Sequence, residues 1–133
     1  MGAKANLANA AEVFGLGIDS VVISHYVGGI DGGRTLDVSD FSGDVIKAGH
    51  IVIRSTSDES LYKPLPVSDS EYASLPEGFE YVGVVVSSVS AAHPMVGIMN
   101  SGTVNDAASP YPISAALKSA LKTAVPTLIF IHA

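Results

Sequence analysis

The sequence of 133 residues contains no cysteine and no tryptophan, and aromatic residues make up only 7% of it. The absence of cysteine excludes disulfide scaffolds and all metal or redox chemistry that depends on thiolates. Charged residues are also scarce, at 15% of the chain, against the ~25% of an average protein. A surface with so few charges must be covered by small neutral residues or by a partner, because large apolar surfaces mark interfaces. We therefore expect an oligomer or a component of an assembly.

Basic residues are few as well: seven Lys and Arg stand against 13 Asp and Glu, and the net charge is -6. Nucleic-acid binding needs a basic stripe that neutralises phosphates, and anionic membranes attract basic clusters. No apolar run reaches the ~20 residues that span a bilayer, and residues 1–9 lack the apolar stretch of a secretory signal. The sequence therefore predicts a soluble protein, made in the cytoplasm, that binds neither nucleic acid nor membranes.

The apolar residues that are present are mostly Val, Ile, Ala and Leu, and they raise the hydrophobic fraction to 47%. Small branched residues of this kind favour a β-rich core. Strand-like segments cover residues 18–27, 35–38, 45–55, 80–89, 95–104 and 127–132, separated by Gly-, Asp- and Ser-rich turns. Gly49, inside the third segment, predicts a bulge or a close backbone approach. Pro64 and Pro66 limit residues 61–67 to an edge strand, because proline donates no ladder hydrogen bond.

Two helices are expected beside the strands. Over residues 113–124, Ile113, Leu117 and Leu121 fall on one helical face, with Pro126 as the stop. A shorter helix is predicted over residues 68–75, where Ser68 and Glu71 have the spacing of a capping box. The predicted fold class is mainly β: one barrel- or sandwich-like domain over residues 18–133, with one C-terminal amphipathic helix and a flexible N-terminal arm.

The arm covers residues 1–17, which are rich in Ala, Asn and Gly. A frayed tail is the usual fate of such a terminus. Its apolar side chains are unusual for a tail, however, and they favour a segment that becomes ordered on a partner. The candidate partner-binding residues are Leu7, Val13, Phe14 and Leu16.

The four histidines, His25, His50, His93 and His132, show no pairing typical of a metal site, because none has a second His or Cys within four residues. We expect structural or surface roles for all four, with His25 facing the interior of the barrel. The aspartates of residues 37–44 miss the spacing of a calcium loop, and we expect them to form a solvated loop with Asx-turns.

Catalytic signatures are missing from the sequence. The glycines of residues 28–33 precede Arg34 but match neither phosphate-binding pattern, so turn geometry is the better interpretation. No GxSxG elbow is present, and no nucleophile is accompanied by a base and an orienting group. We therefore predict no enzyme activity, no catalytic residue, no cofactor and no metal.

Four segments resemble structural proteins of tailed bacteriophages. They are GGRTLDV at residues 32–38, IKAGHIVI at 46–53, YVGVVV at 81–86 and PMVGIMNSGTVN at 94–105. A valine-rich strand followed by a strand that ends in Gly-Thr-Val is similar to the lambda-type head decoration proteins. The chain departs from that pattern in its insertion at residues 61–81 and in its C-terminal helix and strand.

The resemblance implies a virion protein, made in the host bacterium, that decorates and stabilises the outer capsid surface. It implies a trimer, the major capsid protein as partner, and neither a cofactor nor an enzyme activity. Two other interpretations remain open from the residues themselves. One is a small β-barrel module that binds a ligand, and the other is an enzyme with a site around His50 or His93, which would perturb the titration of that histidine.

Overall fold

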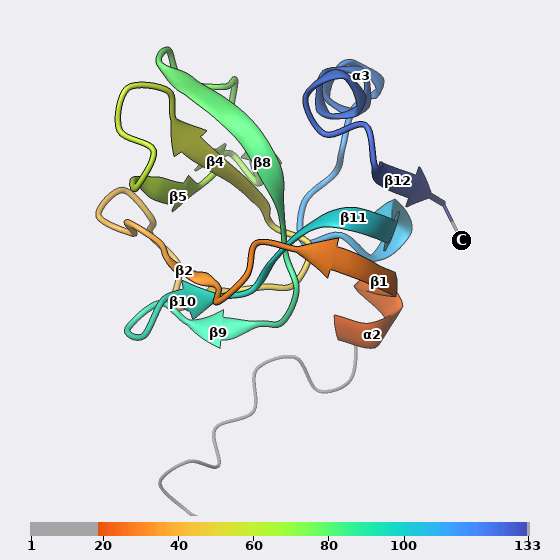
Figure 1. Ribbon diagram of the computed structural model, residues 1–133, viewed down its shortest axis with the longest axis horizontal. Coiled ribbons are helices and arrows are strands. Elements are labelled where there is room, and N and C mark those ends of the chain that lie inside the picture. The colour runs from red at the N-terminus through yellow and green to blue at the C-terminus, as the bar shows by residue number, and fades with distance from the viewer. Residues whose placement is uncertain (1–18, 133) are drawn as a thin grey trace, which may run out of the picture.

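The structure is a computed structural model that describes residues 19–132 (Figure 1). The expected arm, residues 1–17, and its candidate residues Leu7, Val13, Phe14 and Leu16 lie outside the described residues. Strands predominate within them, and one helix of full length, α3 (Ala115–Ala124), stands near the C-terminus. A single turn of helix, α2 (Asp19–Val22), and a 3-10 turn, η2 (Asp106–Ala108), complete the helical content of this part of the chain. The predicted fold class, mainly β with one C-terminal helix, is confirmed.

A six-stranded sheet organises the molecule. Its hydrogen-bonded order is β1-β11-β8-β4-β5, and β12 also pairs with β11. All the pairs are antiparallel except that of β11 with β12. The sheet ends at β1 and β5 and is not closed into a barrel by strand pairing. Its strands are β1 (Ile23–Gly29), β4 (Ile51–Ser55), β5 (Tyr62–Pro64), β8 (Phe79–Val85), β11 (Ile98–Asn105) and β12 (Leu128–Ile131).

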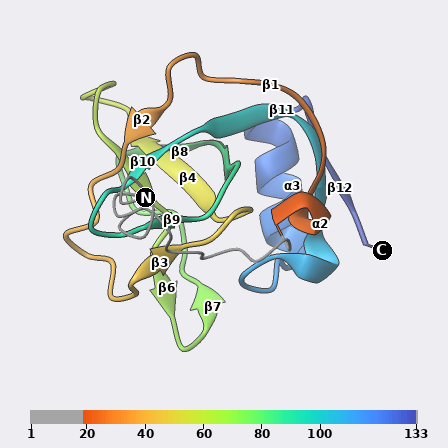
Figure 2. The same cartoon turned by 90° about the horizontal axis from the view of Figure 1, so that it is seen from below.

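Three two-stranded pairs supplement the sheet. They are β2 (Arg34–Thr35) with β10 (Met95–Val96), β3 (Val45–Ile46) with β9 (Val89–Ser90), and β6 (Val67–Ser68) with β7 (Glu71–Tyr72). Figures 1 and 2 show β2, β10 and β9 on the side of the sheet away from α3. A single bridge between Leu36 and Tyr62 connects this layer to β5. The sheet therefore lies between two covering layers.

Both faces of the central strands are buried for this reason. Ile51 and Ile53 of β4 join a core cluster with Leu121 of α3, whereas Val52 between them joins a second cluster with Leu36 and Ile46. Successive residues of a strand point to opposite faces, so an uninterrupted run of Ile and Val fills two cores at once. The valines of β8 divide in the same way, Val84 to the first cluster and Val85 to the second.

Helix α3 forms where the apolar spacing predicted it, although it begins two residues later than expected. Ser114 is its N-cap, and the side-chain oxygen of Ser114 accepts a hydrogen bond from the amide of Leu117 at 3.2 Å. Leu121 is fully buried, and Leu117 packs against the same cluster. After Pro126 the chain enters β12, so the predicted final strand is confirmed.

The predicted helix over residues 68–75 is wrong, because this segment is the hairpin β6–β7. Asp69 and Ser70 form its turn with φ angles of 53° and 63°, values that right-handed helices exclude and type I′ hairpin turns require. Tertiary contacts of Tyr72 account for the difference. Its hydroxyl accepts a hydrogen bond from the amide of Ile51 at 3.3 Å, and its ring packs against His50.

Several strand boundaries also differ from the prediction. The segment 18–27 begins with the helical turn α2, and β1 then runs through Gly28 and Gly29, which were expected in a turn. The segment 80–89 divides into β8 and β9 after Val85, and the segment 95–104 divides into β10 and β11 at Gly97. Each break allows one continuous segment to contribute one strand to the six-stranded sheet and one strand to a two-stranded pair.

Candidate functional site

Two of the strands that pair with β11, namely β1 and β12, present apolar side chains to solvent. Val27 of β1 is 62% exposed, and Ile129 and Ile131 of β12 are 57% and 39% exposed. The register places His25 and Ile129 on either side of Thr103, so both side chains lie on one face of the sheet. We call Val27, Ile129 and Ile131 the edge residues.

Strands β1 and β12 are also edge strands, because each has a strand partner on one side only in the part of the chain that the structure describes. Among residues 19–132, β1 and β12 each pair with β11 and with no second strand. Figure 1 shows β11 between them. An edge strand offers unpaired N–H and C=O groups to another chain, and proteins ordinarily protect such edges with charges or proline. The sequences of β1 (ISHYVGG) and β12 (LIFI) contain neither Lys, Arg, Asp, Glu nor Pro.

The chain enters the described domain at a fixed point next to β1. Asp19, the first described residue, accepts two hydrogen bonds from Ser88, one from the amide and one from the hydroxyl, both at 2.8 Å. Val22 of the same turn is buried against the first core cluster. The candidate arm residues therefore precede a segment that is tied to the domain beside an unpaired edge.

His50 is the histidine with the most unusual environment. It is 1% exposed, and the rings of Phe41, Tyr72 and Tyr111 meet it edge-on at centroid distances of 5.9, 5.3 and 5.7 Å. Its Nε2 lies 3.0 Å from the carbonyl oxygen of Leu65. A carbonyl oxygen can only accept, so Nε2 carries the proton. Burial lowers the pKa of His50 to about 4, against the raising effect of that hydrogen bond.

The perturbed titration of His50 therefore has a structural cause. The ring is neutral near pH 7, fully enclosed and engaged with the backbone. The interpretation of His50 as a catalytic centre predicted a shifted pKa, but desolvation accounts for the shift without a substrate. Its enclosure by aromatic rings and its hydrogen bond to the backbone are contacts of a structural histidine, the role expected from the sequence.

The other three histidines are exposed. The prediction that His25 faces the interior is wrong, because β1 is an edge strand and His25 lies on its outer face. His132 donates a hydrogen bond from Nδ1 to Oδ1 of Asp106 at 2.5 Å, and Lys118 forms an ion pair with the same carboxylate. Partial burial would raise the pKa of Asp106, but the bonds from Lys118 and His132 hold it below its ordinary value. The contacts of Asp106 therefore connect η2 to α3 and to His132, which follows β12.

In the loop before β3, Asp37 forms the predicted Asx-turn contact. The amide of Ser39 donates to Oδ1 of Asp37 at 3.0 Å, and this bond and the one from the Ser39 hydroxyl lower the pKa of Asp37. Asp40 forms an ion pair with Lys63 at 3.4 Å. Within residues 19–132, no three His, Asp or Glu side chains gather as a metal site requires.

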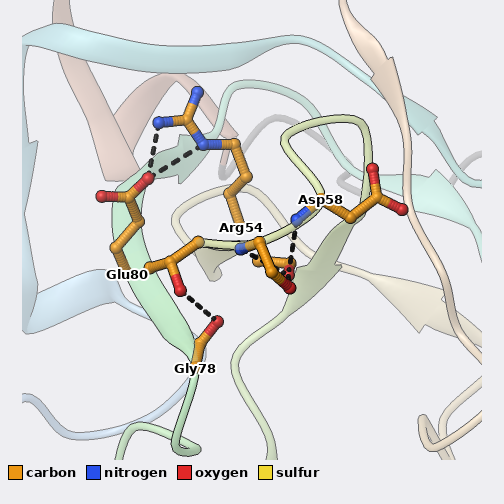
Figure 3. A network of polar contacts seen from close by, with 7 residues as sticks. Arg54, Asp58, Gly78 and Glu80 are labelled. Carbon is orange, nitrogen blue, oxygen red and sulfur yellow. Dashed lines mark hydrogen bonds and ion pairs between the residues drawn. The ribbon is translucent and has the colours of Figure 1, made fainter.

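Polar contacts join the outer ends of β4 and β8 (Figure 3). Arg54 donates to Oε2 of Glu80 from Nε at 3.0 Å and from Nη2 at 2.5 Å. These two residues are directly opposite in the register of β4 and β8. The hydrogen bonds that Arg54 donates to Glu80 and to the hydroxyl oxygen of Tyr62 raise the pKa of Arg54, so its guanidinium is charged at every pH of interest.

A hollow of about 530 Å³ opens beside this pair. The sequence has two arginines, Arg34 and Arg54, and both line this hollow. Their guanidinium carbons lie 5.6 and 6.0 Å from the ring centroid of Tyr62. Sequence reasoning considered Arg34 only as a neighbour of the glycine turn and did not single out Arg54, since residues 20 positions apart give no local motif. The only feature of the sequence that sets these residues apart is that the chain has just two arginines.

Comparison with known protein families, with curated proteins and with solved structures gives no match for this chain. The resemblance to phage decoration proteins therefore stays a prediction. Among the described residues, no helix has the length and apolar character needed to cross a membrane.

Proposed function

We propose that this chain is a structural protein of a phage virion, which decorates the outer surface of the capsid by binding the major capsid protein. It acts without catalysis or cofactor, and it self-associates as a trimer. The observation that carries this proposal is the pair of unpaired edge strands, β1 and β12, with the exposed edge residues Val27, Ile129 and Ile131.

The positions of the phage-like segments support the proposal. Residues 46–53, 81–86 and 94–105 include the first three residues of β4, most of β8 and all of β11, which are the three adjacent central strands of the sheet. A side chain at Gly83 would collide with the carbonyl oxygen of Met99, and one at Gly102 with the carbonyl oxygen of His25. These glycines are therefore needed for the close approach of the central strands, and both lie within the segments on which the resemblance rests.

Binding would follow from the physics of the edges. A partner strand that pairs with β1 or β12 satisfies backbone groups that the domain leaves open, and pockets for alternate side chains give specificity. Burial of the edge residues contributes roughly 25 cal/mol for each Å² of apolar surface removed from water. Leu7, Val13, Phe14 and Leu16 are the side chains of the arm that would anchor to the capsid. Three linked copies would convert weak single contacts into high avidity.

The edge residues give the sharpest test of this proposal. Purified protein is sedimented with capsids from which accessory proteins have been removed, and the bound fraction is compared among variants. Ile129→Asp and a deletion of residues 1–16 should each weaken binding, because they remove the apolar contacts at the edge and in the arm. The matched control Ser119→Asp adds the same charge on the exposed face of α3 and should bind as the parent does. Equal binding by all four proteins would contradict the proposal.

A further inference from the structure

The hollow at Arg34 and Arg54 has a positive balance of charged side chains in an acidic protein. Its charged lining residues are Arg34, Arg54 and Glu80, two cations and one anion, in a chain of net charge -6. Because Arg54 is already paired with Glu80, the positive charge of Arg34 is the part left uncompensated within the lining. A local cationic site on an acidic protein attracts an anion and repels a cation.

The two guanidinium groups are held in place before any ligand arrives. Arg34 donates from Nη1 to the carbonyl oxygens of Asp31 and Gly33, at 3.0 and 2.5 Å. Both bonds come from Nη1. The N–H groups of Nε and Nη2, which point in one direction, can therefore donate two parallel hydrogen bonds to a planar acceptor. Arg54 is fixed by Glu80, and Figure 3 shows its side chain reaching from β4 across to Glu80 on β8. The ring of Tyr62, itself buried, lies within 6.0 Å of both guanidinium carbons.

We propose that this hollow binds a small molecule that carries a single carboxylate. The carboxylate pairs with the fork of Arg34, and the guanidinium of Arg54, held by Glu80 beside Tyr62, lines the same hollow. The body of the ligand lies against Val82 and the turn between α3 and β12, where Val125 and Pro126 line the hollow. This site does not depend on the proposed capsid role, and it gives chemical content to the ligand-binding interpretation.

The chemistry of the lining selects this class of ligand. A guanidinium fork matches the planar geometry of a carboxylate with two parallel hydrogen bonds. A single negative charge balances the single uncompensated positive charge of Arg34, whereas a doubly charged phosphate would exceed it. The volume of about 530 Å³ falls within the range of ordinary small-molecule sites, roughly 300 to 1,000 Å³.

The presence of only two arginines makes a direct measurement possible. In a proton–nitrogen NMR spectrum of the isotope-labelled full chain, the arginine Nε–H region contains one signal for Arg34 and one for Arg54. Single substitutions assign them. The protein is titrated with cyclohexanecarboxylate, with the neutral cyclohexanecarboxamide and with inorganic phosphate, each into the millimolar range.

We expect both Nε–H signals to shift saturably with cyclohexanecarboxylate, at a lower concentration than with phosphate, and not with the amide. Arg34→Gln should weaken binding by about ten- to a hundredfold, the effect of losing a charged hydrogen-bonded partner. The control Lys122→Gln removes the same charge from the exposed side of α3 and should leave binding unchanged. Arg54→Gln is made together with Glu80→Gln, so that no unpaired carboxylate is left; this double variant keeps the net charge of the lining and should weaken binding less than Arg34→Gln does.

Three results would overturn the proposal. The first is the absence of a saturable shift at either arginine, and the second is an equal response to the neutral amide. The third is tighter binding of phosphate than of the carboxylate, which would assign the hollow to another class of anion.

Discussion

At the scale of single residues, His50 shows how one buried polar group can be accommodated. Its ring fills space between Phe41, Tyr72 and Tyr111, and its single hydrogen bond to Leu65 fixes the tautomer. A buried imidazole in such a position is stable only while it is neutral, because an enclosed charge without a partner is costly. The sequence indicated a structural histidine, but it did not indicate which of the four would be enclosed.

The depressed pKa of His50 predicts a specific pH dependence of stability. The unfolded chain titrates near 6.5 and the folded chain near 4, so the unfolded state binds the proton more readily between these values. Stability from the neutral ring is complete above about pH 6.5, and it is lost at roughly 1.4 kcal/mol per pH unit as the pH falls toward 4.

Urea unfolding of the parent and of His50→Phe over this pH range measures the effect. The free energy of unfolding of the parent should fall relative to that of His50→Phe as the pH is lowered. Asp37, Asp58 and Asp106 also have lowered pKa values, but they act in both proteins and cancel in the comparison. His93→Gln, at an exposed position, should behave as the parent. A constant difference between the parent and His50→Phe would contradict the assignment.

Gly49 provides a second prediction at this scale. Its φ angle is 88°, and a Cβ there would collide with the side chain of Val22, so both the backbone and the packing require glycine. Gly49→Ala should lower the free energy of unfolding by about 2 kcal/mol or more. Gly28→Ala is the matched control, because a Cβ at Gly28 would contact nothing within 4 Å, and its effect should be small. Equal stabilities of the two variants, measured by denaturant unfolding, would refute this account of Gly49.

At the scale of elements, the segment over residues 68–75 shows where local patterns mislead. Ser68 and Glu71 have capping-box spacing, yet the chain forms a hairpin because Tyr72 is drawn to His50 and to the amide of Ile51. No short-range pattern contains those partners, which lie about 20 residues away. Helix α3, by contrast, has its cap, its apolar face and its stop within one short segment, and so it could be predicted.

The turn of this hairpin can be improved in a predictable direction. Asp69 and Ser70 both have positive φ, which ordinary residues adopt at a cost of roughly 1 kcal/mol and which Asn-Gly adopts readily. The double substitution Asp69→Asn with Ser70→Gly should therefore raise the free energy of unfolding by about 0.5 to 1 kcal/mol. Ser68→Gly, placed in strand β6 as a control, should lower it. Destabilisation by the turn substitution, seen as a lower urea midpoint, would argue against this turn geometry.

The ion pair between β4 and β8 has a limited energetic role. Arg54 and Glu80 are directly opposite, with side chains 28% and 41% exposed. Solvent screening at that exposure limits the coupling, so a double-mutant cycle with Arg54→Gln and Glu80→Gln should give roughly 0.2 to 1 kcal/mol. Coupling energies several times larger, obtained from denaturant unfolding, would mean that this pair acts as a buried bridge.

At the scale of the whole molecule, the fold class could be predicted from the sequence, but the assignment of strands to the two layers could not. Uninterrupted Val and Ile runs such as that of β8 indicated strands buried on both faces, and the two core clusters confirm it. The division of long segments between two layers, at Gly97 for example, was not predictable, because each half is equally strand-like. The candidate surface is only partly predictable from the sequence: residues 127–132 are predicted as a strand, whereas β1 is expected to contribute an inward-facing histidine.

The central claim also concerns the whole molecule: we propose that this domain acts by binding protein at its edge strands β1 and β12. The most direct measurement is a saturation titration of the purified chain onto capsids stripped of accessory proteins, with bound protein quantified after sedimentation. We predict saturable binding at a fixed ratio to the major capsid protein, and that ratio identifies the lattice position that the chain occupies. Binding that does not saturate, or no binding to mature capsids, would contradict the claim.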